Sequence, residues 1–267
     1  MSELENYELE ALLKQLKVTW TYNSNALEGN TLSKGDTSFI IENGLTVQGK
    51  SIAEHNQVLG HVKAIDLIYA MLGNSSLTES DLFLLHKAIQ TEVVVDSEKP
   101  NGAYKEVPNG RWVEVEGKDT HIYYPHPNDM EHLMGLWFEM YGNIVKSINT
   151  KEEAVKIYAD MHISFTSIHP FWDGNGRLAR LVANFPLLKN DRLPIIISSS
   201  KRQAYIRLLS AYNMSTKALD KESDVLIEEN SEYEELLSFF EEEYLNTEEL
   251  LDTLKSSKHK LNGKINT

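Results

Sequence analysis

Cysteine is absent from the sequence. The chain therefore has no disulfide, no thiolate nucleophile and no cysteine metal site, which fits a reducing compartment. It also lacks any run approaching the roughly 20 apolar residues of a membrane helix. Its first residues, MSELENYELEALLKQLK, are acidic and have no basic stretch followed by an apolar run, unlike a secretory signal. We therefore expect a cytoplasmic protein that does not associate with a membrane.

Positive charge is scarce, because 26 Lys and Arg against 40 Asp and Glu give a formal net charge of −14. Phosphate backbones are bound by clustered Lys and Arg, so no nucleic acid partner is expected. Hydrophobic residues at 41% and charged residues at 25% are ordinary for a folded protein of 267 residues. We expect an N-terminal helical region over 1–50, a core domain over 51–220, and a C-terminal helical region and tail over 221–267.

Apolar residues recur at helical spacing along most of the chain, so the expected fold class is mainly α. The first helix should run toward Gly29, where glycine suits a C-terminal cap. Acidic residues alternate with apolar ones near the C-terminus, as on a helix with a solvated face. The other expected helices cover residues 52–69, 82–89, 130–141 and 152–168, then a segment from residue 178 onward, and residues 228–254.

Three local features depart from that helical pattern. Residues 110–125 alternate with a period of two on both sides of a turn at 117–119, which predicts one β-hairpin. Pro186 should kink the helix that begins at Leu178, because proline removes a backbone hydrogen bond. Residues 256–267 should form a frayed tail.

A polar, glycine-rich segment lies between two of the expected helices. It reads His-Pro-Phe-Trp-Asp-Gly-Asn-Gly-Arg-Leu-Ala-Arg over residues 169–180. Gly174 and Gly176 leave no Cβ in the way of a ligand, so backbone N–H groups can converge on a phosphate where the next helix begins. Arg177 and Arg180 stand three apart on that helix and can each hold phosphate oxygens. Together these residues suit a polyphosphate.

The same segment offers a base and a metal ligand. Asp173 supplies a hard carboxylate oxygen of the kind that Mg²⁺ takes alongside phosphate oxygens. His169 precedes Pro170, which stops the helix, and an imidazole can accept a proton near neutral pH. Taken alone, a histidine or a Gly-x-Gly is more often an ordinary packing residue or turn. Their order here, with the paired arginines, has no evident packing purpose and indicates a site for ATP with magnesium.

Residues 169–180 match the signature H-P-F-x-[D/E]-G-N-G-R-x-x-R and so resemble the Fic family, a likeness that extends from the N-terminal helix to about residue 213. The resemblance implies a helical bundle whose catalytic loop joins two central helices. It implies transfer of AMP from ATP to a Ser, Thr or Tyr hydroxyl of another protein or of the chain itself, with pyrophosphate leaving. Gly176 favours nucleotidyl transfer, since members that transfer phosphate resemble this pattern with lysine there.

The resemblance also implies a role for each matching residue. His169 would deprotonate the hydroxyl, Asp173 would hold Mg²⁺, and the two arginines would neutralise the β- and γ-phosphates. The α- and β-phosphates would be cradled by Gly174, Asn175 and Gly176. Tyr205 and Asn213 fall where family members place an aromatic residue against adenosine and an amide against adenine, although Tyr205 could equally belong to the core.

The hairpin at 110–125 looks like the family's flap, which would add a strand to a target segment by main-chain pairing. An exposed hairpin without function is the alternative. Backbone pairing tolerates many sequences, so the target protein is not specified. Family members also associate through the helical core, which makes a homodimer conceivable.

Residues 24–30, Ser-Asn-Ala-Leu-Glu-Gly-Asn, resemble the inhibitory motif [S/T]-x-x-x-E-[G/N] of some Fic proteins, here with Ser24, Glu28 and Gly29. By itself this pattern is ordinary helix termination. Ahead of a complete signature it implies that Glu28 pairs with Arg180 and keeps the γ-phosphate from its site. The same glutamate can position water to remove AMP from a modified target in this family.

Three rival functions remain at this point. A regulatory protein could bind nucleotide without turnover, although an intact His169 speaks against it. A nucleotidyltransferase could use UTP or GTP, since the signature addresses phosphates and metal and leaves the base unspecified. A metal hydrolase is disfavoured, because His121, His126 and His132 have no compact ligand spacing.

Overall fold

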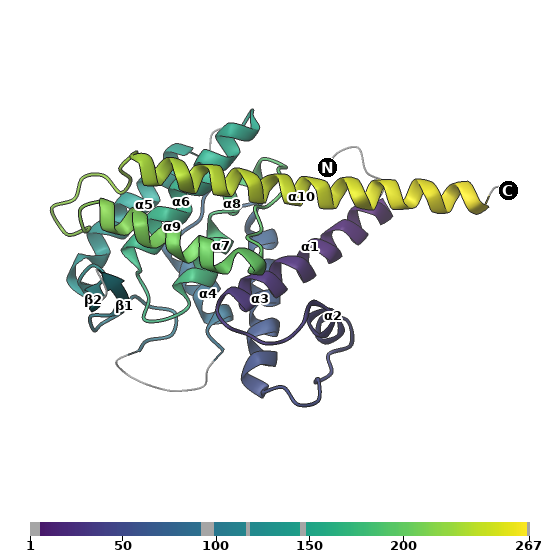
Figure 1. The fold of residues 1–267 in the computed structure, drawn as a ribbon, viewed down its shortest axis with the longest axis horizontal. Coiled ribbons are helices and arrows are strands. Elements are labelled where there is room, and N and C mark those ends of the chain that lie inside the picture. Colours follow the sequence, from purple (N-terminus) through teal and green to yellow (C-terminus); the bar gives the residue numbers. More distant parts are fainter. Residues whose placement is uncertain (1–5, 92–98, 116–117, 145–147, 266–267) are drawn as a thin grey trace.

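The computed structural model describes residues 6–91, 99–115, 118–144 and 148–265. Within these ranges ten α-helices, two short 3₁₀ helices and one hairpin follow one another along the chain (Figure 1). In order, the elements are α1 (Asn6–Leu27), α2 (Lys34–Asn43), α3 (Ile52–Met71), α4 (Glu79–Ile89), β1 (Gly110–Val115), β2 (Lys118–Tyr123), η1 (Pro127–Asp129), α5 (Met130–Ile144), α6 (Lys151–Ile168), α7 (Asn175–Val182), α8 (Phe185–Lys189), η2 (Ser199–Lys201), α9 (Arg202–Ser215) and α10 (Ser231–Ile265). The predicted mainly helical class with one hairpin is confirmed.

Four helices, α2, α3, α4 and α6, begin at a capping box formed by a Ser or Thr and an acidic residue three positions later. In each, a Ser or Thr accepts from the backbone N–H three residues on, and the acidic residue there accepts from the N-cap backbone. Two donors that the helix itself leaves unpaired are thereby satisfied. The boxes are Ser33 with Asp36, Ser51 with Glu54, Thr78 with Asp81, and Thr150 with Glu153.

The centre of the molecule is formed by α6 and α7. α6 contacts α5, α7, α8 and α10, while α7 also contacts α1, α3 and α4. Ten of the eighteen residues of α6 are buried, including Tyr158, Met161, Phe165 and Ile168 on one face. Seven of the eight residues of α7 are buried as well. The loop between these two helices is thus fixed at both ends by the core.

The hairpin lies at one end of the molecule, and α10 extends past the other end (Figure 1). β1 and β2 pair antiparallel with Gly110 opposite Tyr123 and Trp112 opposite His121. Gly117, in the predicted turn, lies outside the described residues. None of the helices described is both long and apolar enough to cross a bilayer.

Two local predictions were wrong. Pro186 does not kink one long helix, because α7 ends at Val182 and α8 begins at Phe185, so that proline stands in a first turn, where its missing N–H is tolerated. The side chain of Asn184 bridges the break, donating to the carbonyls of Arg180 and Ile195 at 2.9 Å. The predicted tail from residue 256 is helical as far as Ile265, the end of α10.

Candidate active site

The loop from His169 to Gly174 connects α6 to α7 through two left-handed residues. His169 caps α6 with φ 53° and ψ 58°, and its N–H donates to the carbonyl of Phe165 at 2.9 Å. Gly174 caps α7 with φ 78°. A non-glycine residue in this region costs about 1 kcal/mol, so strain is held at the histidine predicted to be the base.

Backbone N–H groups gather where α7 begins. Within the described part of the chain, the N–H groups of residues 172–176 have no protein acceptor. The first N–H groups of a helix carry its positive dipole end, which favours an anion. Asn175 is buried and its amide is used within the loop, accepting from the N–H of Phe171 at 2.9 Å and donating to its carbonyl at 2.7 Å. Its side chain therefore shapes the loop, and its N–H belongs to the predicted nest.

The two arginines of the signature have different surroundings. Arg177 donates to the carbonyl of Ile89 and to Oε1 of Gln90, both at 3.4 Å, and lies 3.7 Å from the carboxylate of Asp173. Arg180, only 3% exposed, donates through Nε to the hydroxyl of Ser24 at 3.1 Å and through Nη2 to the Ser24 carbonyl at 2.9 Å. Ser24, near the end of α1, thus supplies two hydrogen-bond acceptors to Arg180.

Glu28 completes the contact between α1 and α7. Its Oε1 lies 2.7 Å from Nη2 of Arg180, as residues 24–30 predict. Although burial alone would lower the pKa of Arg180, the Glu28 carboxylate raises that pKa above its ordinary value. The same oxygen stands over the glycine loop, since a Cβ added at Gly176 would lie 2.5 Å from it. A carboxylate therefore occupies space beside the anion nest, with 43% of its side chain exposed.

His169 is stacked on Tyr124, which follows the hairpin. The two rings are parallel within 2° and their centroids are 3.6 Å apart. Burial, the largest cause, and the charges of Lys105 and Arg111 lower the pKa of His169 to about 3, while one ring N–H donates to the Thr166 carbonyl. The imidazole is consequently neutral at physiological pH, with one nitrogen bound and the other available as an acceptor.

Asp173 is the one carboxylate of the signature, and 59% of its side chain is exposed. Among the described residues, no three His, Asp or Glu side chains form a group that could hold a metal by themselves. A single exposed carboxylate is compatible with Mg²⁺, which proteins commonly hold through one or two carboxylates together with substrate phosphates and waters.

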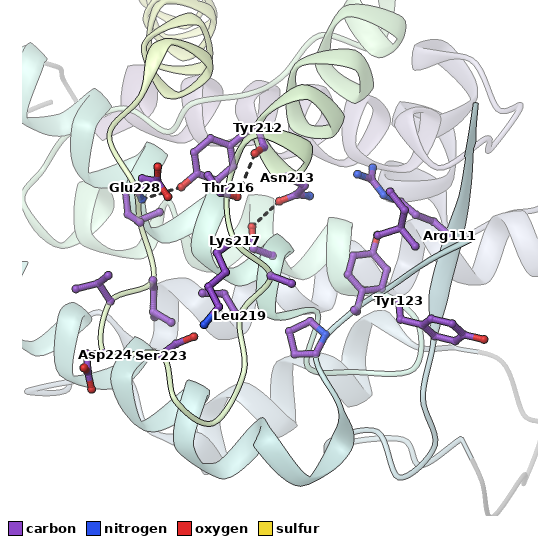
Figure 2. Close-up of a pocket in the computed structure, with 18 residues that line it drawn as sticks. Arg111, Tyr123, Tyr212, Asn213, Thr216, Lys217, Leu219, Ser223, Asp224 and Glu228 are labelled. Carbon is purple, nitrogen blue, oxygen red and sulfur yellow. Dashed lines mark hydrogen bonds between the residues drawn. The ribbon is translucent and has the colours of Figure 1, made fainter. Parts of the chain in front are cut away.

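A pocket of about 290 Å³ opens between the hairpin, the end of α9 and residues 216–228 (Figure 2), and its lining includes Tyr124, the residue that stacks on His169. Asn213 lies at its wall with its side chain toward the pocket, accepting from the hydroxyl of Ser167 at 2.8 Å. Arg111 lines the opposite side and donates through Nη1 to Ser210 at 2.9 Å. Tyr205 is elsewhere, buried with its hydroxyl 2.8 Å from Nε2 of His162 and its ring under Arg180.

Several residues around the site carry no sequence signal that would have identified them. Tyr124, Lys105, Asn109 and His86 each contact the catalytic loop or its histidine. They lie 45 to 83 positions before His169 and outside both short motifs, although Tyr124 falls at the end of the hairpin predicted over 110–125. His86 falls within the helix predicted over 82–89, and its contact with the loop emerges only from the folded structure.

Three further histidines share the lowered pKa of His169 and predict, together with it, how stability depends on pH. Burial is the first cause that lowers the pKa of His61 and His162 to about 3 and of His86 to about 4. Below the ordinary pKa of about 6.5 the unfolded chain gains protons that the native protein does not bind, so stability present above that pH is lost as pH falls. We expect the free energy of unfolding to fall by about 1.4 kcal/mol per histidine per pH unit between pH 6 and 5. Urea unfolding midpoints that stay constant between pH 7.5 and 5 would contradict this.

The sequence is similar to proteins of the Fic/DOC family. The model of the Fic/DOC family matches residues 76–187, which include α4, the hairpin, the loop and α7. Protein adenylyltransferase Fic of Culex quinquefasciatus is 33% identical over 207 residues, covering 75% of this chain. The chain spans 38% of the length of that relative.

Solved structures show the same architecture. A Fic domain containing signaling protein from Bacteroides thetaiotaomicron superposes with a TM-score of 0.81 at 25% identity, covering 96% of this chain and 92% of that one. Fic-1 from C. elegans, residues 134–508, superposes with a TM-score of 0.71 at 21% identity, covering 95% of this chain and 68% of that one. The arrangement of helices around the loop is therefore shared along nearly the whole chain.

Proposed function

The chain belongs to the Fic/DOC family, and from this premise we propose that it is a protein adenylyltransferase that transfers AMP from ATP to a protein hydroxyl. The observation that carries the proposal is the composition of the loop between α6 and α7. It brings together His169, Arg180 and the N–H groups of residues 172–176, which have no protein acceptor among the described residues. The relatives are named for this activity, and the family model covers the whole signature.

In the proposed reaction the target hydroxyl oxygen attacks the α-phosphorus of ATP. The bond from that phosphorus to the bridging oxygen breaks, pyrophosphate leaves, and the hydroxyl proton passes to the free nitrogen of His169. That nitrogen is unprotonated at physiological pH because burial depresses the pKa of the imidazole. The stacked Tyr124 ring holds the imidazole in place against the loop.

The phosphates would lie over Gly174 and Gly176, where the N–H groups have no protein acceptor within the described part of the chain. Arg177 and Arg180 would then bind the β- and γ-phosphate oxygens and offset the charge of the leaving group. Asp173 would hold Mg²⁺, which when bound neutralises charge on the phosphate chain.

The nucleoside and the target would lie toward the hairpin. Asn213 would bind the adenine edge from its wall of the pocket (Figure 2), and Tyr205 would act through Arg180. A target segment would pair with a strand of the hairpin. Trp112 and Tyr123 are 71% and 67% exposed there, so large side chains are already available for such a contact.

We further propose that the protein is restrained in the state seen here. Glu28 holds the guanidinium that would bind the γ-phosphate, and its oxygen stands over Gly176, where phosphate would approach. ATP would have to displace a charge-assisted hydrogen bond before binding productively. The same carboxylate, placed beside the α-phosphate, could also position water to remove AMP from a modified hydroxyl.

The donor is tested by competition in the Glu28→Gly variant with α-³²P-ATP. Label in protein should fall in proportion to added unlabelled ATP, while equal concentrations of UTP or GTP should reduce it less than twofold. This selectivity is expected because the relatives are named as adenylyltransferases. The donor and acceptor of the Asn213 amide could serve an adenine edge but would suit other bases as well. Stronger competition by UTP or GTP would change the assigned donor, and absence of any label with ATP, UTP or GTP would favour a nucleotide-binding regulator.

A further inference from the structure

Successive carbonyl groups of the catalytic loop are held by residues from elsewhere in the chain. The carbonyl of Pro170 accepts from the N–H of Lys105 at 2.9 Å. The side-chain amide of Asn109 donates to the carbonyls of Phe171 at 3.1 Å and Trp172 at 3.3 Å. The carbonyl of Asp173 lies 3.1 Å from Nε2 of His86. Four consecutive carbonyl groups of the loop thus accept hydrogen bonds from α4 and residues 102–109.

The two side chains that donate to these carbonyls, His86 and Asn109, are each oriented by a second hydrogen bond. Nδ1 of His86 accepts from the N–H of Gly102 at 2.8 Å, so the ring proton is on Nε2 and points to Asp173. The His86 ring also stacks on Phe171, with centroids 4.0 Å apart and planes within 11°. Nζ of Lys105 donates to Oδ1 of Asn109 at 2.8 Å, which turns the amide nitrogen toward the loop.

These contacts also determine the direction of the backbone N–H groups on the opposite face of the loop. A trans peptide group is planar, so the C=O of one residue and the N–H of the next point in opposite directions. Holding the carbonyls of Trp172 and Asp173 on one side therefore directs the N–H groups of Asp173 and Gly174 to the other. Those two N–H groups have no protein acceptor within the described residues, and they adjoin the start of α7.

We propose that His86 and Asn109 are positioning residues that preorganise the anion nest by fixing the peptide planes between residues 172 and 174. They would not touch the nucleotide and would act only through the backbone. Donors fixed before the substrate arrives need no reorganisation during the reaction, which is the source of their catalytic value. This inference rests on the proposed function, since it concerns how the same loop binds the phosphates of ATP.

The test compares a ligand that has phosphates with one that lacks them. In the Glu28→Gly parent, α,β-methylene-ATP with Mg²⁺ is titrated by calorimetry, and adenosine binding is measured by saturation-transfer NMR. Asn109→Asp retains shape and its pairing with Lys105 but removes the donor to the loop. His86→Phe retains the stack on Phe171 but removes both ring contacts. Each should weaken the ATP analogue about 10- to 30-fold, because misplaced N–H groups lose charge-assisted hydrogen bonds, and should leave adenosine binding within twofold.

Two further variants serve as controls. His86→Gln, whose amide can still donate toward Asp173, should recover at least half of the lost affinity on a logarithmic scale. Asn43→Asp makes the same chemical change at the exposed end of α2 and should match the parent.

Analogue binding within threefold of the parent in both Asn109→Asp and His86→Phe would overturn the proposal. An equal loss of adenosine and analogue binding would also overturn it, since that outcome indicates a general structural defect. If the parent itself fails to bind the ATP analogue, the proposed function is wrong and this inference falls with it.

Discussion

Glu28→Gly should label itself with AMP from α-³²P-ATP about 10- to 100-fold faster than the wild type. The Glu28 carboxylate is 2.7 Å from Arg180, a guanidinium that also donates to Ser24 of α1 and lies over the ring of Tyr205. A hydrogen bond to a charged group contributes about 1.5–3 kcal/mol, which corresponds to that range of rates if ATP must break it. Initial rates of labelling, with mass spectrometry of the product, provide the measurement.

A second variant separates the effect of the charge of Glu28 from the effect of its side-chain length. Glu28→Gln keeps the side-chain length but not the charge, so its rate should lie between those of wild type and Glu28→Gly. The Glu28→Gly protein should also gain more thermal stability from ATP than the wild type does, since Arg180 is left buried without its carboxylate. Equal labelling rates in all three proteins would refute the inhibitory role.

Hydrolytic removal of AMP, the second activity proposed above, would depend on the same residue, with Glu28 promoting the attack of water instead of obstructing ATP. Purified protein that already carries AMP should release it slowly when Glu28 is present, because the carboxylate can orient an attacking water beside the nest. In Glu28→Ala the modification should persist. Loss of AMP at the same rate from both proteins would remove this part of the proposal while leaving the forward reaction intact.

His169→Ala in the Glu28→Gly background should lower the labelling rate at least about 10³-fold, within the range attributed to general acid–base catalysis. The imidazole is the one titratable side chain of the loop that is neutral at physiological pH and has a free nitrogen. Its low pKa also predicts no loss of activity from protonation of this group between pH 8 and 5.5. A pH profile of kcat/KM in the parent variant measures that directly.

Binding controls keep this result interpretable. His169→Ala should bind ATP within about threefold of the parent, because the histidine contributes a base and no phosphate contact in the proposed site. The left-handed conformation at position 169 is less costly for asparagine than for alanine, so His169→Asn offers a second inactive variant with less backbone strain. Residual labelling above a tenth of the parent rate in both would exclude His169 as the essential base.

Much of the fold was predictable because local chemistry determines it. Apolar periodicity located the main helices, and the Thr150–Glu153 capping box marks the start of α6 within one residue of the prediction. The break between α7 and α8 was not predictable, because it depends on Asn184 reaching Ile195, a contact made only after folding. The helical continuation of α10 was missed because elongation of an existing helix adds one hydrogen bond per residue even for a polar sequence.

The candidate site divides in the same way. His169, Asp173, the glycines and both arginines were identified because twelve consecutive residues contain them, and the pairing of Glu28 with Arg180 followed from a second short motif. The residues that orient the loop were not identified, since His86 and Asn109 reach it from 87 and 62 positions away. Short motifs reveal the groups that do chemistry, whereas their supports come from whichever segments the fold brings near.

Position 176 couples the two proposed roles of the site. The phosphate would pass over its glycine, and the Glu28 oxygen stands 2.5 Å from where a Cβ would be. Any side chain added there would push aside the Glu28 carboxylate, which is the movable end of a partly exposed side chain. A single substitution at 176 would therefore alter both the space for phosphate and the contact between Glu28 and Arg180.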